Sequence, residues 1–146
     1  MPLHGELAEE KTPWVAEQLA AIDAAGTTEV ADVQGMSVAV FTIRGRRSGK
    51  LRRVPLMRVE HDGSYALVAS KGGAPEHPTW YHNVTANPEV EVQDGSERFD
   101  GVARELSGAE REEWWERAVA AYPPYAEYQT KTDRQIPVLV VERADR

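Results

Sequence analysis

The spacing of apolar residues predicts a helix near the start of the chain. Val15, Leu19 and Ile22 follow Thr12-Pro13 at helical intervals, and Gly26 comes after them. A threonine before a proline is typical of a helix start, and a glycine is typical of its end. The polar face of this helix is acidic, which disfavours a membrane-surface helix, so we expect its apolar stripe to pack on the domain.

Three more helical segments are predicted further along the chain. Asn87-Pro88 is a stop signal after the first of them, and Ser107-x-x-Glu110 has the spacing of a capping box at the start of the second. Prolines 123 and 124 interrupt the pattern, so a separate helical turn or two should follow them. The first expected segment runs from Pro78 to Ala86. The second opens at Ser107 and includes Trp114, Trp115 and Val119, and the third is the turn or two that carries Tyr125 and Tyr128.

Runs of β-branched and apolar residues predict about six strands. They cover residues 37–43, 54–60, 65–70, 89–92, 98–106 and 136–141. Asp62-Gly63 and the segment 93–96 have the composition of hairpin turns, and we expect the first three strands to form a meander. Pro55 suggests an edge or a bulge on the second strand. The last run is fully apolar, so it should be a central strand.

These elements indicate an α+β fold: a small barrel of about six mostly antiparallel strands with three or four flanking helices. The strands come in hairpins, without the regular β-α-β alternation of a doubly wound sheet. The chain has 146 residues and no Pro/Gly/Ser-rich linker, so we expect one domain over residues 1–146. Residues 1–35 would be the N-terminal helix and its lead-in.

The composition excludes several classes of protein. The chain has no cysteine, so it has no disulfide and no thiolate metal site, and its four histidines lack the spacing of a zinc hydrolase. We expect no metal. The first residues do not resemble a signal peptide, and no apolar run is long enough to span a membrane. A net charge of −7 argues against nucleic acid as a partner. A cytoplasmic protein without a stable membrane anchor is the expectation.

One segment departs from this acidic balance. Residues 44–53 hold six of the 17 cations and none of the 24 anions of the chain. Six neighbouring cations repel one another, so they need either full solvation in a turn or an anionic partner. The segment Gly45-x-x-x-Gly49-Lys50 resembles a phosphate loop, but it is one residue short, ends in Leu51 and leads into a strand.

Three further features could belong either to packing or to a site. They are Ser70-Lys71-Gly72-Gly73, Trp80-Tyr81-x-Asn83 and Tyr122-x-x-Tyr125-x-x-Tyr128. Taken singly, a glycine pair is a turn, and buried aromatic residues usually serve packing.

Taken together and in order, these motifs resemble one family. The run G-R-R-S-G-K-x-R is followed by V-P-L, A-S-K-G-G-A-P, P-x-W-Y-x-N, A-N-P and Y-P-x-Y-x-x-Y-Q-x-x-T-D-R-x-I-P. This pattern, over roughly residues 38–142, resembles the deazaflavin-dependent nitroreductases, which are oxidoreductases that use coenzyme F420.

The resemblance implies a split β-barrel like that of the flavin-dependent pyridoxamine oxidases. It also implies a reduced deazaflavin, F420, that delivers a hydride to a quinone, a nitro compound or another electron-poor acceptor. The cofactor carries a phosphate and an oligoglutamate tail, which suits the cations of the basic segment. Ser70, Tyr125 and Tyr128 would be catalytic, with Tyr122 shaping the acceptor pocket. The cofactor contacts implied are Arg46, Arg47, Ser48, Lys50, Arg52, Arg53, Val54, Pro55, Leu56, Met57, Val68, Ala69, Ser70, Lys71, Thr79, Trp80, Tyr81, His82, Asn83 and Tyr125.

Two other functions fit much of the same pattern. A module that stores the deazaflavin without turnover would keep the basic segment but would not need hydroxyls at Ser70 and Tyr125. A flavin mononucleotide oxidoreductase could use the same barrel, although one phosphate does not require six cations. The physiological acceptor, and the choice between a monomer and a homodimer, stay open at this point.

Overall fold

The computed structural model describes residues 3, 5–33 and 35–144, and in them four α-helices surround a single antiparallel sheet of eight strands. The helices are α1 (Pro13–Ala25), α2 (Thr79–Ala86), α3 (Gly108–Ala121) and α4 (Pro124–Thr130), with 3₁₀ turns η1 (Thr28–Val30) and η2 (Lys71–Gly73). The strands are β1 (Asp32–Val33), β2 (Met36–Arg44), β3 (Leu51–Met57), β4 (Glu60–His61), β5 (Ser64–Val68), β6 (Glu89–Asp94), β7 (Glu97–Glu105) and β8 (Val138–Arg143). The six longer strands are those expected, and β1 and β4 have two residues each.

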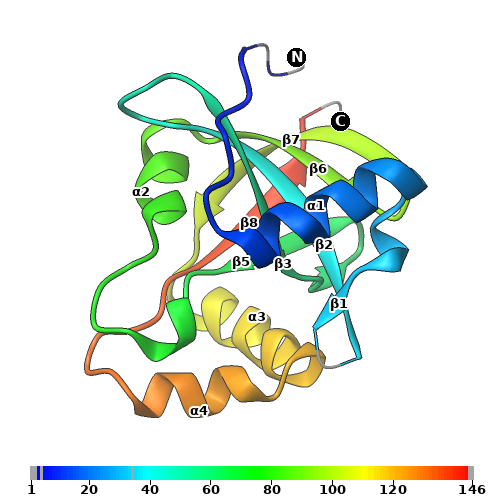
Figure 1. Cartoon of the computed structure of the whole chain (residues 1–146). Helices are drawn as coiled ribbons and strands as arrows, with labels where there is room; N and C mark the ends of the chain where they lie inside the picture. Colours follow the sequence, from blue (N-terminus) through cyan, green and yellow to red (C-terminus); the bar gives the residue numbers. More distant parts are fainter. Residues whose placement is uncertain (1–2, 4, 34, 145–146) are drawn as a thin grey trace.

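The strand order is β1-β2-β6-β7-β8-β5-β4, and β3 pairs with β2 outside this path. The α+β split-barrel fold predicted from the sequence is confirmed. In Figure 1, α1 crosses one side of the sheet, α3 and α4 lie together below it, and α2 lies beside it. Strand β8 lies between β7 and β5, so the prediction of a central last strand is also confirmed.

The predicted meander forms, but its second strand is divided: β3 pairs with β2, and β4 pairs with β5 around the predicted turn at Asp62-Gly63. The second strand also begins earlier than expected, at Leu51, and ends at Met57, with β4 as a separate piece. The additional pairing of β5 with the C-terminal β8 was not predicted. The physical reason is the curl of the sheet: β5 finds its second partner in a strand about 70 residues later, which local patterns do not report.

Strand β3 is an edge strand, as Pro55 suggested. Pro55 lies opposite Val40, and the described residues of β3 pair in the sheet with β2 alone. Edge positions tolerate proline because the missing N–H would otherwise face outward. At its start this edge is partly covered: the Leu51 N–H donates to the Glu6 carbonyl at 2.8 Å, and the Ala8 N–H donates to the Leu51 carbonyl at 2.7 Å.

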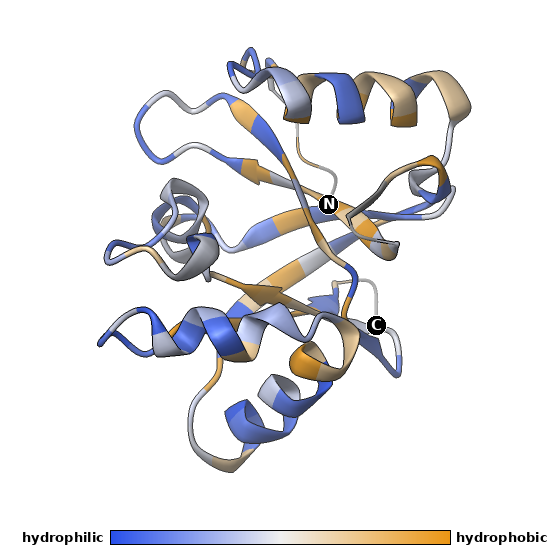
Figure 2. Cartoon of the chain, turned by 60° about the horizontal axis from the view of Figure 1, so that its bottom comes forward, coloured by the Kyte–Doolittle hydropathy of each residue, from blue (hydrophilic) through white to orange (hydrophobic). Residues whose placement is uncertain are grey.

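The central strands bury both faces, which explains their continuous apolar runs. Along β2, Val38 and Val40 join the cluster under α1, α3 and α4, whereas Phe41 and Ile43 join the second cluster, which α2 contacts through Val84. Successive side chains of a strand point to opposite faces, so a strand between two cores needs apolar residues throughout. In Figure 2, orange residues recur along the strands in the middle of the view, and blue residues are frequent in the helices below them.

The helix ends follow the sequence signals in part. Helix α1 begins after Thr12 and ends at Gly26, whose φ of 75° is the left-handed conformation that glycine adopts readily. The predicted capping box at α3 does not form, because the side chain of Ser107 makes no capping hydrogen bond. Glu110 instead accepts two hydrogen bonds from Arg104 at 2.9 and 2.7 Å, and a bidentate guanidinium is the stronger partner.

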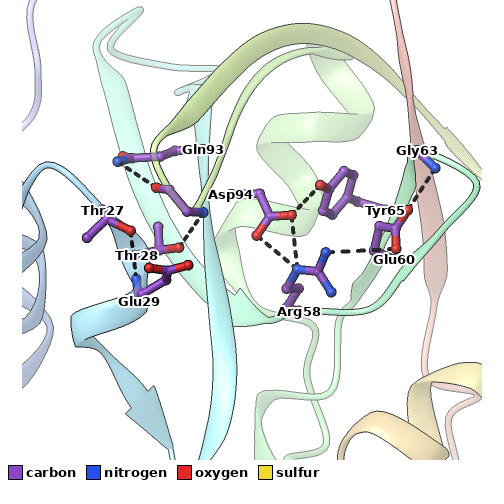
Figure 3. Close-up of polar contacts among 10 residues, drawn as sticks. Thr27, Thr28, Glu29, Arg58, Glu60, Gly63, Tyr65, Gln93 and Asp94 are labelled. Carbon is purple, nitrogen blue, oxygen red and sulfur yellow. Dashed lines mark hydrogen bonds and ion pairs between the residues drawn. The ribbon is translucent and has the colours of Figure 1, made fainter.

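A polar cluster joins β3 and β4 to the β6–β7 hairpin (Figure 3). Arg58 Nε donates to both carboxylate oxygens of Asp94 at 2.9 Å, and the hydroxyl of Tyr65 donates to the same carboxylate. Glu60 lies 3.8 Å from Arg58 and accepts a 2.8 Å hydrogen bond from the Gly63 N–H. Burial, followed by Asp94, raises the pKa of Tyr65, so its phenol stays protonated. We call these residues the Arg58 cluster.

Candidate functional site

A cavity of about 700 Å³ lies between α1, β3, α2 and α4. Its size is in the range of cofactor and small-molecule sites. Residues from six separate parts of the sequence line it: Glu10, Thr12, Trp14, Val15, Gln18, Val38, Arg52, Arg53, Val54, Pro55, Leu56, Met57, Val68, Ser70, Lys71, Pro78, Thr79, Trp80, Asn83, Tyr122, Tyr125 and Tyr128.

The wall formed by β3 is mainly apolar. Residues 53–56 are half-buried, and Met57 is buried. Because β3 is an edge strand, its second side, beyond the bridge at Leu51, has no strand partner among the described residues, and residues 52–57 contribute to the cavity. An apolar strand with exposed edge suits a flat aromatic ring system, since it offers both contact area and backbone polar groups.

Two cations of the basic segment are neutralised within the chain. Arg53 donates to Asp23 on α1 at 2.7 Å, and Lys50 Nζ lies 3.5 Å from Glu6. The hydrogen bond from Arg53 lowers the pKa of Asp23, which keeps that carboxylate charged. Both pairs are at least partly exposed, so they contribute little to stability. They attach the N-terminal segment and α1 to the start of β3.

The side chains of Arg46, Arg47 and Arg52 are different. Within the described part of the chain they form no ion pair and no hydrogen bond. Arg52 lines the cavity, and the Arg46 backbone N–H donates at 3.1 Å to Oδ1 of Asn83, which is buried and also lines the cavity. The turn between β2 and β3 is therefore anchored at the cavity, with three guanidinium groups available to an anion.

Helix α2 presents one face to the cavity and the other to the sheet. Thr79, Trp80 and Asn83 line the cavity. The hydroxyl of Tyr81 donates to Glu105 on β7 at 2.7 Å, and burial together with that carboxylate raises the pKa of Tyr81 to about 12. The ring of His82 lies 5.5 Å from the ring of Tyr81. These two residues are not in the cavity lining.

The segment after β5 brings Ser70 and Lys71 into the cavity wall. Ser70 is buried, with 8% of its surface exposed. Lys71 adopts a φ of 47°, which is uncommon for a residue with a side chain, and Gly72 and Gly73 follow with φ of 63° and 86°. Strained backbone of this kind occurs where the surrounding structure holds a group in place, often at functional sites.

Three tyrosines form the part of the wall that α4 and the end of α3 contribute. The rings of Tyr122 and Tyr125 pack edge to face at 5.0 Å, and the hydroxyls of Tyr122 and Tyr128 are 3.1 Å apart. That hydrogen bond, and then burial, raise the pKa of Tyr122 to about 12. Burial raises the pKa of Tyr125, whose hydroxyl has no hydrogen-bond partner in the described residues. Both stay neutral phenols at ordinary pH and can donate a hydrogen bond.

The predicted site residues divide into two groups. The cavity brings together all three predicted catalytic residues, Tyr122 and most of the predicted cofactor contacts. It does not include Arg46, Arg47, Ser48, Lys50, Ala69, Tyr81 or His82. Their assignment as cofactor contacts stays a prediction, and for the turn residues it requires a ligand that extends out of the cavity.

The sequence reasoning missed the contribution of α1. Trp14, Val15 and Gln18 line the cavity, Trp14 with 62% of its surface exposed. Oε1 of Gln18 is buried without a hydrogen-bond partner in the described residues. The available signal was a tryptophan at the helix start, outside the apolar stripe of Val15, Leu19 and Ile22, because a large aromatic residue on the polar face of a helix can mark a binding site.

In the residues that the structure describes, no group of three His, Asp or Glu side chains could hold a metal ion. No helix in that part of the chain has both the length and the apolar composition to cross a membrane.

Comparison with known proteins identifies close relatives. The model of the F420H(2)-dependent quinone reductase family matches residues 14–143. The structure of an F420-H2 dependent reductase is 66% identical and covers 72% of this chain and 93% of that one, with a TM-score of 0.69. A structure described as a domain-swapped dimer is 60% identical and covers 91% of this chain and 100% of that one, with a TM-score of 0.73.

More distant relatives agree with these matches. An F420H(2)-dependent quinone reductase of Mycobacterium tuberculosis is 35% identical over 102 residues, which are 68% of each chain. An FAD-binding protein from Mesorhizobium loti is 14% identical and covers 86% of both chains, with a TM-score of 0.51. At that identity the likeness shows the fold alone.

Proposed function

The chain belongs to the F420H(2)-dependent quinone reductase family, and from this premise we propose that it transfers a hydride from reduced coenzyme F420 to a quinone. We include nitro compounds as a second class of electron-poor acceptor. The observation that carries the proposal is one cavity that combines an apolar strand wall, a cavity-lining arginine without a partner among the described residues, and buried tyrosines.

The residues present fit a deazaflavin with an anionic tail. The half-buried residues 53–56 and the buried Met57 of β3 offer a mainly apolar wall for the ring system. Arg52 at the cavity, with Arg46 and Arg47 on the adjoining turn, would bind the phosphate and the carboxylates outside it. When bound, the reduced deazaflavin supplies the hydride, and the protein supplies position and surroundings.

The tyrosines would act on the acceptor. Reduction of a quinone carbonyl places negative charge on its oxygen, and a neutral phenol is a suitable donor to that oxygen. Tyr125 is buried, keeps its proton because burial raises its pKa, and has a hydroxyl that is available to a ligand. Tyr128 is held by its hydrogen bond to Tyr122, so that pair would shape the pocket and exclude water.

Ser70 would orient the ligand from a different part of the cavity wall than Tyr125, because it follows β5 whereas Tyr125 lies on α4. Its side chain lines the cavity next to Lys71, at the end of the segment that follows β5. Two hydroxyls from separate elements, Ser70 and Tyr125, can define the orientation of one bound molecule better than either alone. Such positioning contributes to rate because misplaced reactants rarely reach the reactive geometry.

The direct test follows binding and turnover separately. Oxidised F420 is titrated into the protein and its fluorescence gives the dissociation constant. Reduced F420 is then mixed with a soluble quinone, and recovery of the oxidised absorbance gives the rate. We expect tight binding and enzyme-dependent turnover. Binding without turnover of any quinone or nitro compound would instead support a storage module.

Competition with flavin mononucleotide tests the cofactor choice. We expect F420 with several glutamates to displace flavin mononucleotide, because three arginines that have no ion pair with any described residue exceed what one phosphate requires. Equal or tighter binding of flavin mononucleotide would overturn this part of the proposal. The cytoplasmic location and the choice between a monomer and a homodimer stay predictions, and sedimentation of the purified chain decides the second.

A further inference from the structure

Arg134 makes an unusual set of contacts behind the cavity wall. It lies between α4 and β8 and is half-buried. Its Nε donates to the Ala74 carbonyl at 2.9 Å, and Nη2 donates to the Ser70 carbonyl at 2.8 Å. Nη1 contacts both the Ala69 carbonyl at 3.1 Å and Nδ1 of His77 at 3.0 Å. Four of the five N–H groups of one guanidinium are thus used on a single loop.

The backbone of Arg134 is itself attached to α4. Gln129 on that helix donates through Nε2 to the Arg134 carbonyl at 2.8 Å, and its Oε1 accepts from the Ile136 N–H at 2.9 Å. The position of the guanidinium therefore follows the position of α4. Through Arg134 and Gln129, the loop that begins at Ser70 is connected to the helix that carries Tyr125 and Tyr128.

A second contact joins the same two parts. Gly73 approaches the end of α4 so closely that a Cβ atom there would lie 2.7 Å from the Tyr128 carbonyl oxygen and 3.0 Å from Cβ of Lys131. Its φ of 86° also disfavours any side chain. The loop is therefore held against α4 at two places: at Ala69 and Ser70 through Arg134, and at Gly73 by direct contact.

We propose that Arg134 is a positioning residue that fixes the Ser70–Ala74 loop against α4. It keeps the Ser70 hydroxyl and the Tyr125 and Tyr128 hydroxyls at a constant separation in the cavity. Arg134 does not line the cavity, so it acts through these residues. This inference rests on the proposed function, because it assigns a purpose to the separation of those hydroxyls.

Arginine is required at this position by geometry. Its planar fork reaches three carbonyl oxygens and an imidazole nitrogen at once, whereas a lysine ammonium is a compact charge with three donors. We expect Arg134→Lys and Arg134→Ala to lower kcat by about tenfold or more, on the scale of misplaced catalytic groups. The dissociation constant of F420 should change by less than about threefold, because the cations of the basic segment supply much of that affinity.

The contact with His77 makes the connection sensitive to pH. Arginine can only donate, so Nδ1 of His77 must accept and the ring must be neutral. Burial and Arg134 lower the pKa of His77, and His82 acts in the same direction, while Glu105 acts in the opposite one. The Tyr81 ring, 4.6 Å away, also faces it, and Glu76 is its neighbour in the chain. The contact is therefore intact at neutral pH and is lost as the pH falls through the lowered pKa.

Hydrogen exchange of the ligand-free full chain tests the connection without any assumption about function. We expect faster exchange of the amides of residues 70–74 in Arg134→Ala and Arg134→Lys than in the wild-type protein. Lower pH should have the same effect on the wild-type protein, after correction for intrinsic rates, and little further effect on Arg134→Ala. Unchanged exchange in both variants would overturn the proposal.

Turnover and chemical rescue complete the test. Millimolar guanidinium, but not ammonium, should restore part of kcat in Arg134→Ala, which a merely structural loss would not show. A kcat of Arg134→Lys equal to that of the wild-type enzyme would contradict the proposal. If Arg134→Ala does not fold, the same measurements on Arg134→Lys and Gly73→Ala test the proposal. Gly73→Ala pushes the loop away from α4 without changing Arg134, so its kcat should also fall. A wild-type enzyme without quinone turnover, but with the expected exchange, would contradict the proposed function and leave the positioning role intact.

Discussion

The Arg58 cluster and the basic segment use the same side chain in opposite ways. Arg58 has both oxygens of Asp94 and a nearby Glu60 as partners, and Tyr65 completes the cluster (Figure 3). Arg52 lines the cavity and, in the described residues, has no partner for its guanidinium. An arginine that the fold neutralises stabilises the fold, whereas one that the fold leaves without an anion is available to a ligand.

Within the described residues, three arginines of the basic segment lack ion pairs, which is unexpected in so acidic a chain. The chain carries a net charge of −7, with 24 anions that could have neutralised every cation. Asp23 and Glu6 do neutralise Arg53 and Lys50, at the side of the segment that faces α1. Arg46, Arg47 and Arg52 form no ion pair within the described residues, which supports a role in binding an external anion.

The largest effect that separates the two regions should come from Asp94→Ala. Removing this carboxylate leaves Arg58 and the Tyr65 hydroxyl without their main partner. We expect the free energy of unfolding to fall by about 3 kcal/mol, at the lower end of the range for breaking a buried ion pair because Arg58 is partly exposed. Urea unfolding measures it, with the exposed Glu89→Ala as control. The F420 affinity should not change; a matching loss of affinity would remove the distinction between the two regions.

The converse effect is expected for the basic segment. Arg46→Ala and Arg52→Ala should each weaken F420 binding by about 1.5–3 kcal/mol, the range for hydrogen bonds to charged groups. Their unfolding free energies should stay within about 0.5 kcal/mol of the wild-type value, as for surface substitutions. Titration with F420 checks both variants, and Arg98→Ala provides the same change of charge outside the cavity. If Arg98→Ala weakens binding equally, net charge and not position explains the affinity.

A smaller effect is expected for the hydroxyl groups that line the cavity. Tyr125→Phe and Ser70→Ala should lower turnover with a quinone or a nitro acceptor by about tenfold or more, the scale of positioned hydroxyl groups. F420 affinity should change much less. Tyr65→Phe is the matched control, because it removes a buried hydroxyl that bonds to Asp94 away from the cavity. Normal turnover of both cavity variants would show that their hydroxyls serve packing alone.

Local sequence patterns predicted most of the elements because each element carries its own signals. The continuous apolar runs of β2 and β8 reflect burial on both faces, and Gly26 and Pro88 mark the ends of helices. The pairing of β5 with β8 could not be predicted, since it joins segments far apart in the chain and depends on the curl of the sheet. The capping box failed for a related reason: Arg104, on a neighbouring strand, competes for Glu110.

The site shows the same division. The motifs that resemble the family located Ser70, Tyr125 and the β3 wall in one cavity. They did not predict that Trp14 and Gln18 of α1 would join it, because that depends on where the helix packs. Nor did they predict that Tyr81 would turn toward Glu105, a contact set by the distance between α2 and β7.

The salt dependence of F420 binding tests the central claim most directly. If the arginines without internal partners hold the anionic tail, the dissociation constant should rise steadily with ionic strength, because exposed charges are screened within about 10 Å at 0.1 M salt. The slope should become clearly smaller when Arg46, Arg47 and Arg52 are all replaced by alanine, and it should stay unchanged in Asp94→Ala. An affinity that does not respond to salt, or a triple variant with the wild-type slope, would contradict the account.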